Sequence, residues 1–337
     1  MAFKTWVDGE VLYAADLNTN FVASTLSKYN KYITRVEDTE EGLIIFGNGT
    51  HWSTTDKIST DSGATWASGG FGNANLASVS GANGIALNNT YVFTTDSGVT
   101  WSSASTAPAN MSSTHSLHLF SSTIGVAGGH PSSGVSIWYT ADGGDNWTVS
   151  ASGPTAHTSS IQMASATIGY AVDVSGNIWK TTDAGVNWSD TGDGANASGY
   201  SQGCGISCID TDTMIILISN TSDTCHIQHY TNSTNTVSEL YRIGVGSGGD
   251  ETFTFSGNSI MTADNGNIYW LLNARNVDGY WLFMWDGTHL NQRWLVAGEG
   301  VPGSEPYVAT YGDFIYANLA VDGPTDVQII AIDVRGD

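Results

Sequence analysis

The chain is poor in basic residues, and this shortage excludes several classes of protein. Ten Lys and Arg residues face 32 Asp and Glu residues, which gives a formal net charge of −22 at pH 7. Nucleic-acid binding and attraction to anionic membranes both need a basic surface, so neither is expected. No apolar run approaches the about 18 residues that insert into a membrane. The N-terminus also lacks the basic region and apolar stretch of a secretory signal.

Cysteine is almost absent, and proline is scarce. The three cysteines are Cys204, Cys208 and Cys225. An odd number argues against a disulfide scaffold, and no second closely spaced pair completes a zinc site. We therefore expect buried free thiols, no metal site and no cofactor.

Glycine, tryptophan and short polar tracts are abundant instead. The sequence holds 40 Gly and 12 Trp residues among long Ser, Thr and Asn tracts. Stretches rich in helix-forming residues are absent after about residue 33. Many short strands joined by tight turns give this composition, so the chain is expected to be all-β.

One motif, [S/T]-x-D-x-G-x-[T/N]-W, occurs four times, at residues 59–66, 94–101, 140–147 and 181–188. Its aspartates accept hydrogen bonds from backbone N–H groups two or three residues later, and its glycines take a positive φ. The tryptophan begins the next strand and covers the turn. Because one turn recurs four times, a structural role is favoured over acid catalysis or metal binding. The fixed residues are Asp61, Gly63, Trp66, Asp96, Gly98, Trp101, Asp142, Gly144, Trp147, Asp183, Gly185 and Trp188.

Each copy of the motif follows three short strand-like runs and precedes a fourth. Four strands in about 40 to 50 residues are typical of one blade of a β-propeller. After residue 190 the motif fades but the runs continue, as at Met214–Ile218, Ile268–Leu271 and Val327–Ile332. Residues 33–337 allow seven blades of about 44 residues or six of about 51, and the motif spacing favours seven. We expect Ile33–Glu37 to supply the fourth strand of the last blade and to close the ring.

The motif resembles the BNR or Asp-box repeat. Propellers with this repeat include sialidases, sortilin-type receptors and photosystem-assembly factors. Membership of the fold therefore does not decide the function.

Residues 1–32 differ from the rest and are expected to form a separate N-terminal segment with a short helix that starts near Ala14. An isolated helix of this length cannot bury its apolar face, so it must pack on the propeller or on copies of itself. That face comprises Leu17, Phe21, Val22, Leu26, Tyr29, Tyr32 and Ile33.

This segment resembles the virion-attachment segment of tailed-phage fibre and appendage proteins. Tyr13 departs from the pattern, because the family has a hydroxyl residue there that caps the helix. The matching residues are Trp6, Gly9, Glu10, Leu12, Ala14, Asp16, Leu17, Asn18 and Phe21.

The resemblance implies a structural protein of the virion, such as a tail or neck fibre. It would be assembled in the host cytoplasm, would bind other virion proteins through residues 1–32 and would form a homotrimer. The propeller at 33–337 would then meet a host glycan or surface protein. A purely architectural spacer without a ligand remains an alternative.

A sialidase-like glycosidase is the enzymatic alternative. That likeness would imply an arginine triad, a Tyr/Glu nucleophile pair and an acidic catalyst, and Arg35, Arg242 and Arg275 could supply the triad. Glu239 and Tyr241 lie shortly before Arg242 on alternate strand positions, so the three cannot all face one way. The Arg-Ile-Pro or Arg-Leu-Pro element that opens sialidase domains is missing. We therefore expect no enzyme and assign no catalytic residue.

Other candidate sites are weaker. His115/His118 and His226/His229 are three apart, so on strands each pair should point to opposite faces, which argues against a metal site. Segments 191–205 and 244–251 are expected to be Gly-rich loops that contact the host. Aromatic residues of the last two blades could stack on sugars, although packing between blades is the favoured role of each: Trp270, Tyr280, Trp281, Trp285, Trp294 and Tyr307.

Overall fold

The fold is built from antiparallel strands. The computed structural model describes residues 33–37, 44–45, 51–53, 57–61, 65–70, 74–88, 91–194, 200–220, 225–243, 253–254, 260–262, 266–274, 280–295, 307–311, 314–320 and 326–333. Residues 1–32 lie outside this set, and so do the predicted helix and every residue of the attachment pattern. The all-β prediction is confirmed for the described part of the chain, whose elements are strands joined by turns.

Three of the sheets come entirely from the first half of the chain and have four strands in sequence order. The first contains β2 (Ile44–Ile45), β3 (Trp52–Ser53), β4 (Lys57–Ser59) and β5 (Ala67–Ser68). The second contains β6 (Ala74–Ser80), β7 (Asn83–Asn88), β8 (Tyr91–Thr94) and β9 (Ser102–Ser103). The third contains β10 (Met111–Leu119), β11 (Gly125–Pro131), β12 (Ile137–Thr140) and β13 (Thr148–Val149).

The next three sheets repeat the plan with small departures. One contains β14 (Thr158–Met163), β15 (Gly169–Asp173), β16 (Asn177–Thr181) and β17 (Ser189–Gly194). Another contains β18 (Tyr200–Cys208), β19 (Thr213–Asn220), β20 (Cys225–Thr231) and β21 (Thr236–Ile243). In the sixth, both β22 (Phe253–Thr254) and β23 (Ile260–Thr262) pair with β24 (Ile268–Ala274), which β25 (Tyr280–Trp285) and β26 (Leu290–Leu295) follow.

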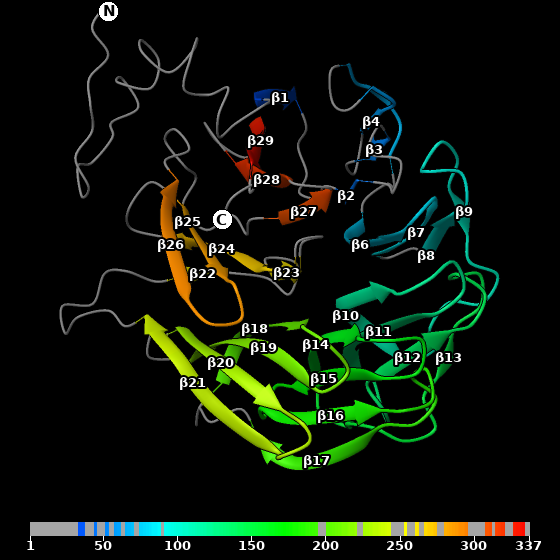
Figure 1. Cartoon of the computed structure of the whole chain (residues 1–337). Helices are drawn as coiled ribbons and strands as arrows, with labels where there is room; N and C mark the ends of the chain where they lie inside the picture. The colour runs from blue at the N-terminus through cyan, green and yellow to red at the C-terminus, as the bar shows by residue number, and fades with distance from the viewer. Residues whose placement is uncertain are drawn as a thin grey trace, which may run out of the picture.

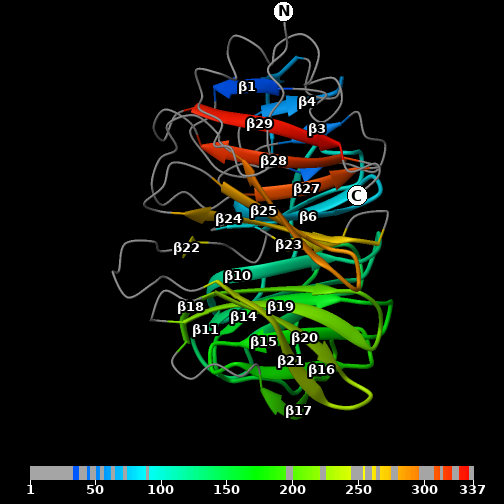
Figure 2. The same ribbon diagram turned by 60° about the vertical axis from the view of Figure 1, so that its left-hand side comes forward.

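The last sheet joins the two ends of the described chain. Its order is β27 (Tyr307–Tyr311), β28 (Phe314–Ala320), β29 (Asp326–Asp333) and then β1 (Ile33–Glu37). Ile33 lies opposite Ile330, and Glu37 lies opposite Asp326. Figure 2 shows the blue strand β1 directly beside the red strand β29. The predicted pairing of Ile33–Glu37 with the last unit is therefore confirmed.

One strand from each sheet takes part in a closed circuit of contacts. β2 contacts β6, β6 contacts β10, and the contacts continue through β14, β18, β23 and β27 back to β2. In Figure 1 the sheets accordingly follow one another around a common centre in the order of the chain. The later strands of each sheet lie progressively farther out.

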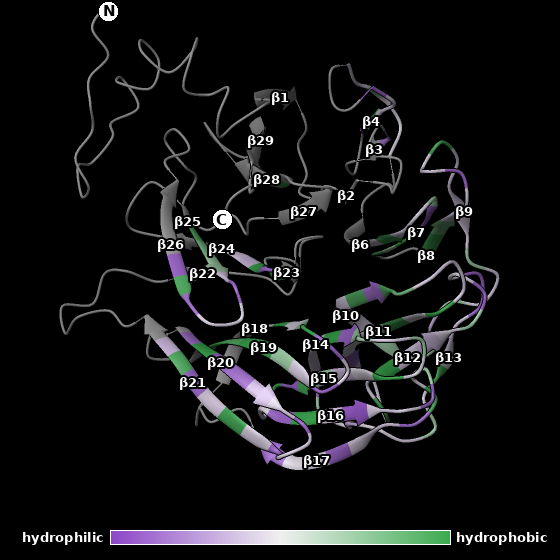
Figure 3. Cartoon of the chain, viewed as in Figure 1, coloured by the Kyte–Doolittle hydropathy of each residue, from purple (hydrophilic) through white to green (hydrophobic). Residues whose placement is uncertain are grey.

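Each central sheet buries both of its faces against its neighbours. On β19, Met214, Ile216 and Ile218 pack with Tyr170 and Val172 of the preceding sheet. The alternate residues Ile215 and Leu217 pack with Trp270 of the following sheet. A strand buried on both faces is continuously apolar, which explains why β19 does not alternate in hydropathy. Figure 3 shows green segments on β19, whereas the outer strand β17 is pale to purple.

One predicted loop is largely strand. Segment 191–205 continues β17 as far as Gly194, and β18 begins at Tyr200. Pairing of Asp190 with Trp179 of β16 holds β17 in place, so neighbouring strands override the weak β-propensity of its sequence. Segment 244–251, the other predicted loop, lies outside the described residues.

Two smaller findings concern the interior and membranes. Cys208 is buried, and burial followed by the nearby Asp210 charge raises the pKa of its thiol. Within the described part of the chain, no helix is long and apolar enough to cross a membrane.

Candidate functional site

The four copies of the motif, here called the repeat turns (residues 59–66, 94–101, 140–147 and 181–188), connect the third and fourth strands of four successive sheets. Connections between the first and second strands reach the same end of a sheet, because neighbouring strands are antiparallel. The second-to-third connections and the links to the next sheet reach the opposite end. The two ends of the structure therefore carry different sets of connections.

The aspartates of the repeat turns accept one recurring set of hydrogen bonds. Thr94 donates its hydroxyl to Asp96 Oδ1 over 2.7 Å. Thr100 donates its backbone N–H to Oδ1 over 2.9 Å and its hydroxyl to Oδ2 over 2.6 Å. The same bonds recur at Asp61, Asp142 and Asp183.

The donating N–H lies four residues after the aspartate, so the predicted distance of two or three residues was wrong. Ser97 and Gly98 both take positive φ values, 60° and 79°. Two successive left-handed residues curl the chain, and the residue that returns to the carboxylate is Thr100 rather than one inside the turn.

These hydrogen bonds keep the carboxylates ionised. At Asp61 the Thr65 hydroxyl is the main cause of a lowered pKa. At Asp96, Asp142 and Asp183 burial is the largest single influence and raises the pKa, but the hydrogen bonds together outweigh it and the pKa falls below its ordinary value. A carboxyl that serves as the general acid of a glycosidase needs a raised pKa. The shifts therefore point away from acid catalysis.

The glycine and tryptophan of a repeat turn pack onto the preceding sheet. Gly185 has φ +90°, and a Cβ there would lie 2.8 Å from Val126 Cγ1 on β11. Trp188 is 2% exposed and donates its Nε1–H to the Gly185 carbonyl over 3.1 Å. Trp147 makes the same bond to Gly144 over 3.0 Å. Gly63 lies outside the described residues.

The repeat turns also pair with the chain that leaves the preceding sheet. Trp188 donates its backbone N–H to Ser152 O over 3.1 Å, and Ala151 donates to Val186 O over 2.8 Å. In the previous copy, Trp147 donates to Thr106 O over 3.0 Å. The sequence did not reveal these contacts, because no local pattern marks the receiving segment.

Removing one of these carboxylates should lower the stability of the fold, although the carboxylate is exposed. Asp183→Ala removes three hydrogen bonds and is expected to lower the free energy of unfolding by about 1–2 kcal/mol. Asp190→Ala is the matched control, because that exposed aspartate accepts one bond, from Gly192 N–H, and should cost less than about 0.5 kcal/mol. Urea unfolding of both variants checks the difference, and equal costs would contradict the structural role.

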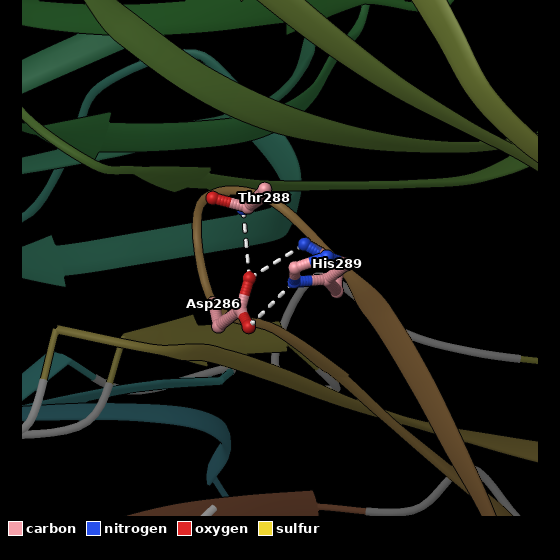
Figure 4. Close-up of polar contacts among 3 residues, drawn as sticks. All are labelled: Asp286, Thr288 and His289. Carbon is pink, nitrogen blue, oxygen red and sulfur yellow. Dashed lines mark hydrogen bonds and ion pairs between the residues drawn. The ribbon is translucent and has the colours of Figure 1, made fainter.

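In two sheets that lack the motif, other aspartates hold the connection between the third and fourth strands. Asp212, between β18 and β19, accepts hydrogen bonds from the Ser233 N–H over 2.8 Å and the Ser233 hydroxyl over 2.6 Å, across the end of its sheet. Asp286 accepts the N–H of Thr288 over 2.7 Å and also contacts His289 (Figure 4). Neither aspartate was predicted from the sequence. Asp212 cannot be recognised there, because it and its donor Ser233 are 21 residues apart.

Two of the three arginines considered for a sialidase triad are on outer strands. Arg35 is on β1 and Arg242 on β21, each the outermost strand of a different sheet. Arg275 lies outside the described residues. Glu239 Oε2 lies 2.7 Å from His226 Nδ1, and Tyr241 is 42% exposed.

One histidine pair departs from the prediction. Thr114 pairs with Gly129 and Ser116 with Gly128, so His115 is the extra residue of a β-bulge in β10. The bulge shifts the alternation, and His115 and His118 both face the next sheet: His115 lies against His157, and His118 Nδ1 accepts the Met163 N–H over 3.2 Å. His226 and His229 lie on opposite faces of β20, which pairs regularly with β19. Within the described residues, no group of three or more His, Cys, Asp or Glu side chains could hold a metal ion.

The aromatic residues of the sixth sheet include core residues. Trp270 is fully buried, and its ring stacks on Phe283 with centroids 5.6 Å apart. Trp285 is half-buried against the same cluster. The favoured role for these two, packing between sheets, is confirmed. Tyr280 and Trp281 are on β25, Trp294 on β26 and Tyr307 on β27, and their side chains lie outside the described set.

Comparison with known proteins identifies the architecture. No family model and no curated protein matches the chain. The structure of U3-55K is similar with a TM-score of 0.61 and 12% identity, over 88% of this chain and 98% of that one. YCF48 from Cyanidioschyzon merolae gives 0.59 and 17%, over 91% and 100%. The GH74 xyloglucanase from Xanthomonas campestris gives 0.57 and 10%, over 88% of this chain and 55% of that one. At these identities the likeness shows the fold alone, and the chain has the all-β, four-stranded-sheet architecture of these β-propellers.

Proposed function

We propose that the protein is an appendage of a phage virion, in which residues 1–32 attach a seven-bladed β-propeller formed by residues 33–337. Seven blades are supported by the closed circuit of contacts among β2, β6, β10, β14, β18, β23 and β27. The pairing of β1 with β29 supports closure of the ring by the N-terminal strand. The Asp-box residues of the repeat turns stabilise each turn and its packing on the preceding blade.

The observation that carries the virion assignment is the pattern from Trp6 to Phe21, which resembles phage attachment segments. The fold is compatible with it, because the propeller begins at β1, the outermost strand of its sheet. A segment that precedes β1 leaves the ring at its rim and can reach a neighbouring chain without crossing the blades. We therefore infer a homotrimer joined through residues 1–32 and docked on other virion proteins.

The propeller would present a binding end to the host. The repeat turns fill the end that carries the third-to-fourth connections, and their polar groups are used within the structure. The links between blades, such as residues 150–157 between β13 and β14, belong to the opposite end. We propose that this end contacts a host glycan or surface protein.

No described feature favours a glycosidase. Arg35 and Arg242 are on the outer strands of separate sheets, whereas a triad must converge on one carboxylate. The similar structures include a xyloglucanase and a YCF48 bound to a D1 peptide, so the fold itself accommodates both an enzyme and a peptide-binding protein.

The attachment role is tested by adding charge to the apolar face of residues 1–32 in the full chain. The double variant Leu17→Asp, Phe21→Asp should remain folded but lose trimer formation and incorporation into particles, because the buried charges would be unpaired. Ser27→Asp adds a charge to the opposite side of the expected helix and should assemble normally. Size-exclusion chromatography with light scattering gives the oligomer, and particle pull-down gives incorporation.

Normal assembly of the double variant would reject the attachment role. A panel of fluorogenic glycosides tests the enzymatic alternative in the same preparations. We expect no turnover; turnover that Arg242→Ala abolishes would establish a glycosidase instead.

A further inference from the structure

Three imidazoles from two neighbouring sheets meet at the end opposite the repeat turns. His115 comes from the bulge in β10, His130 from β11, and His157 from the connection between β13 and β14. The His115 and His157 ring centroids are 3.9 Å apart, and those of His130 and His157 are 5.6 Å apart. We call these three residues the histidine trio.

The surroundings of His115 and His157 favour neutral rings. His157 Nε2 is buried and makes no hydrogen bond within the described part of the chain. Ser113 Oγ lies 2.8 Å from His115 Nε2, and Ser112 Oγ lies 3.1 Å from His130 Nδ1, so the hydroxyls are uncharged partners. The histidine–carboxylate pairs of the described residues are at His226 and His289, not in the trio.

The other titratable groups nearby do not supply a compensating charge. Asp173 is the carboxylate of β15 opposite Thr158, but it accepts hydrogen bonds from Ser175, Asn177 and Trp179. His118 of β10 is buried farther along the strand, against Met163. Protonation of His115 and His157 would therefore place two like charges on rings whose centroids are 3.9 Å apart, with no described anion to offset them.

We infer that the histidine trio is an acid-sensitive contact between the third and fourth repeat-bearing sheets: its packed rings hold the β13–β14 connection on β10 and β11, and acidification releases that connection. Two backbone hydrogen bonds report whether the connection is held. Ser136 donates its N–H to Pro154 O and Val174 donates its N–H to His157 O, each over 2.8 Å. Both acceptors belong to the released connection.

The direction of the pH effect follows from the lowered pKa values. Burial, then the His115 and His130 charges, lower the pKa of His157 from 6.5 to about 4. Burial, and then the charge of His130, lower the pKa of His115 below its ordinary value. A base with a lowered pKa stabilises the closed form at pH values above 6.5, and this contribution is lost as the pH falls from 6.5 towards 4. For His157 alone, the equilibrium constant for opening should rise at least about tenfold by pH 5, once solvent screening of this half-buried ring is allowed for.

Amide hydrogen exchange on the full chain tests the inference. Protection factors, which correct for the intrinsic pH dependence of exchange, are measured at pH 7 and pH 5. We expect those of Ser136 and Val174 to fall at least about tenfold at pH 5, while amides of β19 keep theirs. His157→Gln removes the central ring, so its Ser136 and Val174 protection should be equal at the two pH values.

Two further variants keep the test specific. His289→Gln removes an exposed histidine of another sheet and should retain the full acid response. His115→Gln should reduce the response, and because it leaves the β13–β14 connection unchanged it answers the question if His157→Gln does not fold. Protection that is independent of pH in the unaltered protein, or a response that survives in both trio variants, would overturn the inference.

Discussion

Replacing Trp188 by alanine is expected to lower the free energy of unfolding by about 4 kcal/mol. The indole is 2% exposed and packs with Val126 and Ile137 of one sheet and with Ile161 and Met163 of the next. The substitution leaves a cavity between the two sheets and removes the bond from Nε1 to Gly185 O. Urea or thermal unfolding followed by tryptophan fluorescence and circular dichroism measures the loss.

Two controls separate the sources of this loss. Trp188→Phe keeps most of the ring but loses the hydrogen bond, and should cost about 1 to 2 kcal/mol. Val149→Ala changes a 48% exposed residue of the adjacent outer strand β13 and should cost less than about 1 kcal/mol. If Trp188→Ala cost no more than Val149→Ala, the repeat turns would not join neighbouring sheets.

The second large effect is expected at Gly144, where Ala should destabilise the protein by about 3 kcal/mol. Gly144 has φ +103°, and an added Cβ would lie much closer than normal contact to Ile85 of the preceding sheet, with Phe93 Cβ at 3.5 Å. The left-handed backbone costs about 1 kcal/mol or more for a residue with a Cβ, and the overlap adds about 1–3 kcal/mol.

Gly134→Ala isolates the backbone part of this cost. Gly134 has φ +82°, but nothing lies within 4 Å of a Cβ placed there. Its substitution should therefore cost only about 1 kcal/mol. Equal unfolding midpoints for the two variants would show that Gly144 is required by the turn and not by the close approach of two sheets.

The fold was predictable to the extent that its signals are local. The repeat turns mark the third-to-fourth connection of four sheets, and the short apolar runs after residue 190, such as Met214–Ile218, are strands. The position of β1 beside β29 followed from a simple requirement: the last unit lacked a fourth strand.

Features that depend on distant contacts were not predictable. One inserted residue in β10 reverses the facing of His115, and no sequence pattern distinguishes a bulged strand from a regular one. The approach of His157 depends on the following sheet, and Asp212 reaches Ser233 across the end of its own sheet. The acid-sensitive contact therefore needs the three-dimensional arrangement, whereas the attachment segment rests on sequence alone.

The pairing of β1 with β29 affects how the protein must be made. Ile33 leaves the ribosome long before its partner Ile330 is synthesised. Until then the nascent chain holds an unclosed arc with two exposed sheet edges, which are prone to join other chains. A product truncated after Ala320 would lack β29 and keep both edges open. The ring can therefore close only after β29 (Asp326–Asp333) has been translated.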